Sequence, residues 1–159
     1  MKSLVILLFL IPFGYSVSAQ DTIVSTALNG KYIGTLNDDG IPHGKGELIS
    51  NFGGGYEGNW KKGVYHGFGI KRWLNGNVYE GEWKNGMRHG EGRMTWEPGF
   101  FLEGNWKNDN LHGKGLIMYP AGNGRRGKWK HGKMHGKGFS IATDGRESED
   151  SWFYGYSLK

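Results

Sequence analysis

Large and polar side chains alternate in short stretches along this chain. In Tyr-Glu-Gly-Glu-Trp, residues 79–83, the alternation places Tyr79, Gly81 and Trp83 on one face of a strand and the two glutamates on the other. The Lys-Asn-Gly that follows predicts a tight hairpin turn, because Asn-Gly accommodates the positive φ that such turns require. The stretch from His89 then returns as a second strand. Each such unit is therefore predicted to be a β-hairpin.

The hairpin pattern recurs with a constant step of 23 residues. His-Gly-x-Gly motifs, a tryptophan series and a second aromatic series all follow this step. The motifs begin at His43, His66, His89, His112 and His135; the tryptophans are Trp60, Trp83, Trp106, Trp129 and Trp152; the second series is Trp73, Trp96 and Tyr119. A repeat of this length indicates stacked copies of one structural unit.

The glycines follow the same period, and 24 of the 30 fall in five series. We predict that large rings from one strand lie across glycines of the facing strand, because a missing Cβ leaves room for a ring. Gly90 and Gly92, for example, are expected to lie beneath an aromatic side chain of a neighbouring unit. The positions assigned a structural role in the repeat are Gly67, Gly69, Gly90, Gly92, Gly113, Gly115, His66, His89 and His112.

These units resemble MORN repeats, whose pattern is roughly Y-E-G-x-W-x-x-G-x-x-H-G-x-G. The stretches YEGNWKKGVYHGFG from Tyr56, YEGEWKNGMRHGEG from Tyr79 and LEGNWKNDNLHGKG from Leu102 match it closely, and those from Tyr32 and Arg125 match less well. Repeats at the two ends of an array are expected to depart from the consensus, because one of their sides has no neighbouring repeat.

The repeats and the resemblance together predict an all-β fold, an elongated single-layer array of about five stacked antiparallel β-hairpins with short terminal caps. We expect an N-terminal cap at 20–31 and repeats over 32–147, with units starting near 32, 56, 79, 102 and 125. Residues 148–159 read as a truncated sixth unit and a C-terminal cap, whose aromatic residues cover the open end or form an edge for a second copy.

The first 19 residues differ from the rest of the chain. Lys2 precedes an apolar run from Leu4 to Phe13, and small residues lead to Ala19. This layout is typical of a secretory signal peptide over 1–19, cleaved near Ala19. The alternative is a membrane anchor, but the run is shorter than the roughly 20 apolar residues that span a bilayer. The sequence therefore predicts a secreted, periplasmic or cell-envelope protein.

Composition excludes several classes of function. The chain has no cysteine, which removes disulfides, thiol catalysis and cysteine-based zinc sites. Its formal net charge of +5 becomes +4 without Lys2, a mild basic bias that suits weak attraction to anionic surfaces. The sequence contains no helix-turn-helix or RNA-binding signature, and we expect no nucleic-acid partner.

The periodic histidines and glutamates are the remaining candidates for chemistry. Equivalent histidines of successive hairpins lie two strands apart, about 9.5 Å, which is too far for them to share one zinc ion. Hydrogen bonding at the turn is the preferred role. Glu57, Glu80 and Glu103 also recur, but repeated environments do not separate carboxyl pKa values as acid–base catalysis requires. We expect ion pairs with lysine or arginine instead, and no catalytic site, metal or cofactor.

The repeat array itself is the candidate binding surface. Its aromatic residues either form only the core or also contact a protein or an extended peptide; the candidates are Tyr56, Trp60, Trp73, Tyr79, Trp83, Trp96, Trp106, Tyr119 and Trp129. Four lysines, Lys61, Lys84, Lys107 and Lys130, follow the tryptophans and are candidate contacts to an anionic surface. Resemblance to MORN proteins implies a protein-interaction or scaffolding module. A membrane-associating module is the alternative, and a homodimer through the C-terminal end is a further possibility.

Overall fold

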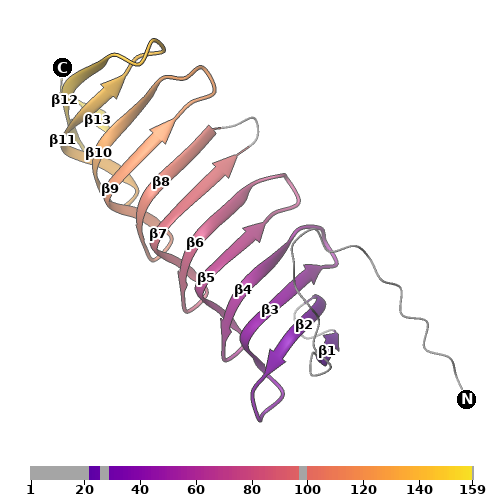
Figure 1. Cartoon of the computed structure of the whole chain (residues 1–159). Coiled ribbons are helices and arrows are strands. Elements are labelled where there is room, and N and C mark those ends of the chain that lie inside the picture. Colours follow the sequence, from indigo (N-terminus) through magenta and orange to yellow (C-terminus); the bar gives the residue numbers. More distant parts are fainter. Residues whose placement is uncertain (1–21, 26–28, 97–99, 159) are drawn as a thin grey trace, which may run out of the picture.

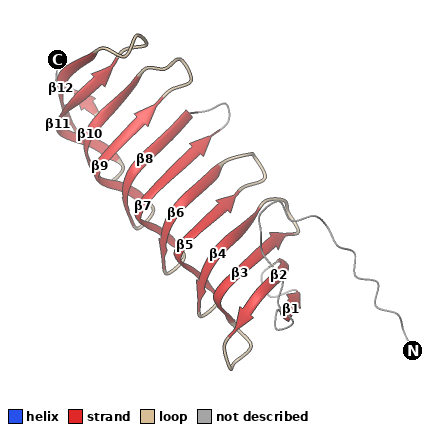
Figure 2. Ribbon diagram, viewed as in Figure 1, coloured by secondary structure: helices blue, strands red, loops and turns tan. Residues whose placement is uncertain are grey.

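A computed structural model describes residues 22–25, 29–96 and 100–158 of the chain. All regular structure in these residues is β-strand (Figure 2). The predicted signal peptide, 1–19, lies outside the described residues, as does Gln20. The prediction of an all-β fold is confirmed.

Thirteen strands form one sheet in which every strand pairs, antiparallel, with its neighbours in the sequence. Figure 1 shows them following one another along an elongated, single-layered array. The strands are β1 (Thr22–Ser25), β2 (Gly30–Leu36), β3 (Pro42–Ser50), β4 (Gly55–Lys61), β5 (Val64–Arg72), β6 (Val78–Lys84), β7 (Met87–Trp96), β8 (Phe100–Lys107), β9 (Asn110–Met118), β10 (Gly124–Lys130), β11 (Lys133–Ile141), β12 (Glu147–Phe153) and β13 (Tyr156–Ser157).

A continuous row of glycines crosses the sheet. Gly81 pairs with Gly69 on one side and with Gly92 on the other, and the same pairing continues from β2 to β11. We call this the glycine row; its members are Gly34, Gly46, Gly58, Gly69, Gly81, Gly92, Gly104, Gly115, Gly127 and Gly138. The row runs across the array and divides each of these strands into a part near the hairpin turn and a part near the link to the next hairpin.

The core lies on one side of the sheet, here called the aromatic face. The Tyr79 ring lies over Gly92 in the same hairpin, where a Cβ would meet the phenol ring and its hydroxyl. The Tyr79 hydroxyl donates a hydrogen bond to the Glu82 carbonyl at 3.1 Å. From the next hairpin, Trp106 Nε1 donates to the Gly92 carbonyl at 2.9 Å. The glycine thus leaves room for one ring and accepts a hydrogen bond from another.

The same arrangement repeats in the two preceding units. The rings of Tyr32 and Tyr56 lie over the glycines at positions 46 and 69. The indoles of Trp60 and Trp83 donate to the carbonyls of these two glycines at 3.0 and 3.1 Å. Tyrosine and tryptophan rings meet edge to face, with centroids 5.0 to 5.6 Å apart, which is a favourable geometry for aromatic pairs. The core is therefore an aromatic ladder.

The prediction that glycines make room for rings is confirmed for the second glycine of His-Gly-x-Gly and is wrong for the first. The ring over Gly92 comes from the same hairpin, however, and not from a neighbouring unit as predicted. Gly90 has φ of 57°, and a Cβ there would meet the Glu82 carboxylate instead of a ring. Gly67 and Gly113 likewise have positive φ and lie beside asparagine side chains. The first glycine lies in a bulge at which the strand register shifts, and glycine takes the positive φ found there at little cost.

The hairpin turns have the predicted geometry. Asn85 and Gly86 have φ of 53° and 79°, as a type I′ turn requires. Gly86 N–H donates to the Tyr65 carbonyl of the preceding hairpin, so the turns also connect successive units. Asp109 replaces the turn glycine in one unit, and its carboxylate pairs with Arg88 at 3.0 Å.

The last strands close one end of the sheet. Trp152 is buried and continues the aromatic ladder, while Asp150 takes the place of the next glycine in the row, opposite Gly138. Ser157 Oγ in β13 donates to the Asp150 carboxylate at 3.1 Å. The side chains of Phe153 and Tyr156 remain 57 and 75 % exposed.

Replacement of Gly92 by alanine is expected to destabilise the protein more than replacement of Gly136. Gly136→Ala should lower the free energy of unfolding by about 1 kcal/mol, the cost of a positive φ of 81° for alanine, because nothing lies within 4 Å of the new Cβ. Gly92→Ala forces the Tyr79 ring aside, an overpacking that costs about 1–3 kcal/mol or more. Denaturant unfolding measures both. Equal losses would show that glycine conformation, and not the space beneath the rings, holds the array together.

Candidate functional site

Most of the candidate aromatic residues form the core. Tyr56, Trp60, Tyr79, Trp83, Trp106 and Trp129 are between 0 and 9 % exposed. Their neighbours in the sheet and the rings of adjacent units cover them. Of the two alternatives, core alone or core with partner contact, this burial favours the first for these six rings, because they have almost no exposed surface.

The second aromatic series is half-buried. Trp73, Trp96 and Tyr119 pack against the ladder from the link side of the strands. Phe100, which sequence analysis missed, lies between two of them: its ring stacks on Trp96 with centroids 4.7 Å apart and on Tyr119 at 5.4 Å. These three candidates keep some exposed surface, and their role in binding stays a prediction.

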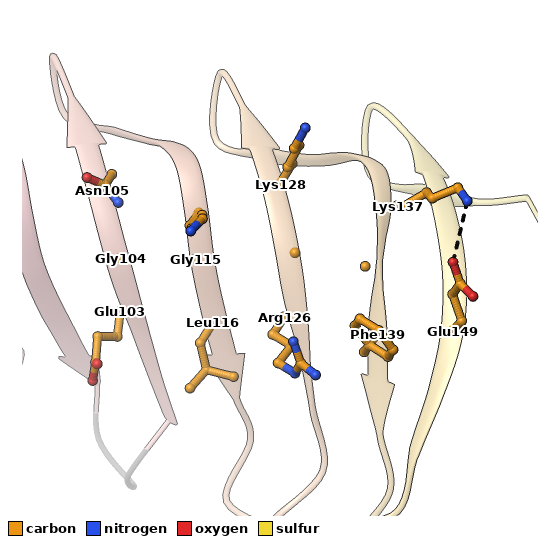
Figure 3. Close-up of a pocket in the computed structure, with 13 residues that line it drawn as sticks. Glu103, Gly104, Asn105, Gly115, Leu116, Arg126, Lys128, Lys137, Phe139 and Glu149 are labelled. Atoms are coloured by element: carbon orange, nitrogen blue, oxygen red, sulfur yellow. Dashed lines mark ion pairs between the residues drawn. The ribbon is translucent and has the colours of Figure 1, made fainter.

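The opposite side of the sheet, here called the polar face, carries the outward side chains on either side of the glycine row. In Figure 3 the side chains of Glu103, Leu116, Arg126 and Phe139 form one line across neighbouring strands, and those of Asn105, Lys128 and Lys137 form another. The glycine backbone lies between the two lines. Because glycine has no side chain, the backbone here is open to a ligand.

Three shallow hollows follow one another along the polar face. The largest, of about 570 Å³, extends over β8 to β12. The second, of about 430 Å³, shares Glu103, Gly104 and Asn105 with it and extends back to Phe68 in β5. The third, of about 310 Å³, lies between Lys45 and Ile70. The second and third hollows share Phe68, so the three together form one long, shallow furrow along the sheet.

The charges of the polar face are divided along its length. Directly beside the glycine row, β3 to β8 carry six glutamates and two cations: Glu47, Glu57, Glu80, Glu82, Glu91, Glu103, Lys45 and Arg93. At the equivalent positions, β9 to β12 carry four cations and one glutamate: Lys114, Arg126, Lys128, Lys137 and Glu149. Farther from the row, Arg72 and the lysines beside the turns add cations, and Glu147, paired with Arg126, adds a glutamate. The strip beside the glycine row is therefore acidic towards the N-terminus and basic towards the C-terminus.

The three periodic glutamates have different neighbours. Glu103 forms an ion pair with Arg93 at 3.4 Å, as expected. Glu80 lies beside Arg93 in register but makes no ion pair with a described residue. Glu57 lies opposite Glu47, and burial followed by repulsion from Glu57 raises the pKa of Glu47. The expectation of cation pairing is thus confirmed for Glu103 and, among the described residues, wrong for Glu57 and Glu80.

The four lysines Lys61, Lys84, Lys107 and Lys130 are all exposed and stand beside the hairpin turns. We call them the lysine line. None forms an ion pair with a described residue, and Lys130 Nζ lies 5.8 Å from the Tyr154 ring centroid. Exposed apolar side chains, those of Ile41, Val64 and Met87, occupy the same edge. None of the described residues forms a helix of sufficient length and apolarity to span a bilayer.

The periodic histidines do not gather at one site. Nδ1 of His66, His89 and His135 is buried and has no hydrogen-bond partner among the described residues, so the expected turn hydrogen bonds are not made through this atom. His135 instead contacts the Tyr154 ring, with centroids 4.8 Å apart. In the described part of the chain, no three side chains of His, Cys, Asp or Glu are arranged to hold a metal ion.

Comparison with protein families identifies the repeat. The model of the MORN repeat matches residues 38–51, 56–78, 79–99, 103–124 and 126–145, together more than half of the chain. The chain belongs to the MORN-repeat family. MORN repeats are in general modules for interaction with proteins or membranes, and proteins built of them are generally non-catalytic. No match was found among curated proteins.

Sequence analysis of this MORN array found the inward positions but, of the outward ones beside the glycine row, only the periodic glutamates. Phe68, Arg93, Lys114, Lys128 and Phe139 line the hollows but were not among the candidates. Such residues can be found in the sequence as the two neighbours of each glycine in the row, because strand alternation places these neighbours on the polar face. These positions do not repeat from unit to unit, so a search for periodicity overlooks them.

Alkaline pH is expected to destabilise the protein through its buried tyrosines. Burial raises the pKa of Tyr79 and of Tyr56 well above the ordinary value of 10.0. A raised pKa means that folding favours the neutral phenol, so this contribution to stability is intact below pH 10 and is lost as pH rises towards the folded-state value. Tyrosinate absorbance should therefore show these two residues ionising only when the protein unfolds.

Tyr79→Phe is the matched control for the alkaline transition. It keeps the ring but removes the hydrogen bond to the Glu82 carbonyl, at a cost of about 1 kcal/mol at neutral pH. Its stability should fall less steeply above pH 10 than that of the unaltered chain. Free titration of all tyrosines near pH 10 without unfolding would contradict the burial described above.

Proposed function

We propose that this chain is a non-catalytic MORN-repeat module that binds a protein partner along its polar face. The furrow beside the glycine row carries the proposal. It combines bare backbone, charged side chains of both signs and exposed apolar groups, such as Phe68 at 53 % exposure. An extended segment or a flat protein surface fits such a shallow, elongated site better than a small molecule does.

Partner capture should depend on the polar face. Phe68→Ala and Lys128→Glu, one in each half of the furrow, are each expected to weaken binding of the native partner about tenfold or more, since central interface residues dominate affinity. Val64→Ala, an apolar truncation at the turn edge, is the matched control for Phe68→Ala. Quantified co-purification from the native source provides the measurement. Binding that survives both polar-face substitutions would reject this surface.

The lysine line supports a second candidate, attachment to an anionic lipid surface. Its four cations make no ion pair with a described residue, and they share one edge of the array with the apolar side chains of Val64 and Met87. Flotation with anionic vesicles at low and high salt tests this function, because screening weakens exposed charge contacts. Salt-sensitive flotation that charge reversal of the four lysines abolishes would favour the membrane. Flotation that is absent at both salt concentrations would favour the protein partner.

We further propose that the module acts outside the cytoplasm. The apolar run from Leu4 to Phe13 and the small residues before Gln20 support export and cleavage. Mass spectrometry of the native protein should find Gln20 at the mature N-terminus. A chain that retains Met1 or Lys2 in the native cell would overturn this localisation.

A further inference from the structure

Several charges of the polar face have no partner of opposite sign within the described chain. Glu80 and Glu91 in the acidic half make no ion pair there, nor do Lys114 and Lys128 in the basic half. All four side chains are exposed. The two halves adjoin at β8, where Glu103, Gly104 and Asn105 line both neighbouring hollows. The face therefore carries opposite, unused charge on the two sides of one strand.

We propose that two copies of this chain pair through their polar faces, antiparallel, with the two-fold axis running along β8. This proposal rests on the proposed function, because it uses the same surface and names a second copy as its partner. A rotation about an axis parallel to the strands reverses the order of the strands and preserves position along each strand. It sets β7 against β9 of the other copy, β6 against β10 and β5 against β11.

This placement matches charges of opposite sign. Glu91 and Lys114 both lie on the turn side of the glycine row, in β7 and β9, one strand from the axis. Glu82 and Lys128 occupy the same side in β6 and β10, two strands from it. Because strands lie about 4.8 Å apart, each member of a pair stands at the same distance from the axis. An isologous dimer makes every such contact twice.

The link side of the glycine row matches as well. Glu80 in β6 faces Arg126 in β10, and Ile70 in β5 faces Phe139 in β11. Arg126 is already held by Glu147 at 2.5 Å and lies over the Phe139 ring, 4.2 Å from its centroid. Figure 3 shows Arg126 and Phe139 side by side on this face. An ordered cation and an aromatic ring are thus available for contact with the second copy on the link side of the glycine row.

Like charges also meet in this arrangement, and they limit its strength. Glu103 faces its own counterpart, although its pairing with Arg93 offsets part of the repulsion. Glu57 faces Glu149, which pairs with Lys137 at 3.7 Å. At the turn edge Lys84 faces Lys130, and Lys107 in β8 faces its own counterpart. The three complementary charge pairs lie within two strands of the axis, and we therefore expect a weak, salt-sensitive dimer centred on β8.

Charge reversal tests the pairing directly. Glu91→Lys and Lys114→Glu should each weaken the dimer about tenfold or more, since each creates two like-charge contacts in a symmetric interface. The double variant, Glu91→Lys with Lys114→Glu, exchanges the signs and should restore the dimer to within about threefold of the unaltered chain. Sedimentation velocity over a concentration series at low and high salt measures the dissociation constants, and thermal unfolding confirms that each variant folds.

Lys45→Glu is the matched control. Lys45 occupies the same position as Lys114 in His-Gly-Lys-Gly, on the same face, but lies in β3, far from the proposed axis. It changes the net charge as Lys114→Glu does and should leave the dimer unaffected. An equal effect of the two substitutions would attribute the loss to net charge and overturn the specific pairing.

Other outcomes separate this inference from the proposed function. A chain that stays monomeric at low salt, yet loses its native partner on Lys128→Glu, would overturn self-pairing and keep the polar face as a binding surface. A dimer that ignores reversal at Glu91 and Lys114 would place self-association elsewhere, such as the C-terminal end. A third outcome is a dimer that weakens on reversal of Glu91 or Lys114 while no other protein depends on the polar face for binding. That result would overturn the proposal of a separate protein partner and keep the pairing of two copies.

Discussion

The array depends on a contact between an aromatic ring and a backbone without a side chain. Tyr79 lies over Gly92, and the indole of Trp106 donates to the carbonyl of the same glycine. A single-layer sheet has no second layer to cover its core, so each ring must be covered by neighbouring rings and by the strand that it crosses. Glycine permits this close approach, and the hydrogen bond satisfies a buried indole N–H that would otherwise be costly.

This constraint explains how the repeats change towards the C-terminus. Leu102 and Arg125 stand where Tyr56 and Tyr79 stand in the preceding units. In the described part of the chain, the buried indole nitrogens of Trp129 and Trp152 have no hydrogen-bond partner, whereas those of Trp60, Trp83 and Trp106 have one. Loss of the tyrosine thus accompanies a less regular contact between ring and glycine. The units that match the repeat pattern best are those in which the contact is complete.

The sequence was sufficient to predict the inward half of this molecule. Ring positions such as Tyr79 and Trp83, and the turn at Asn85 and Gly86, follow from local alternation and turn chemistry, which the repeat then multiplies. It was not sufficient to assign Gly90, because a bulge and a socket both require glycine. It also did not show whether Trp60 is exposed, since burial depends on how neighbouring hairpins stack.

The candidate site was harder to predict than the core, because only the core positions repeat from unit to unit. Repeated packing fixes the residues that face the rings, whereas the side chains beside the glycine row face solvent and are free to differ between units. The third residue of His-Gly-x-Gly is aromatic at Phe68, acidic at Glu91 and basic at Lys114 in three successive units. The stabilising pattern is therefore periodic, and whatever distinguishes this array in binding must reside in positions that break the period. The division of the polar face into acidic and basic halves is the largest such break within the described residues.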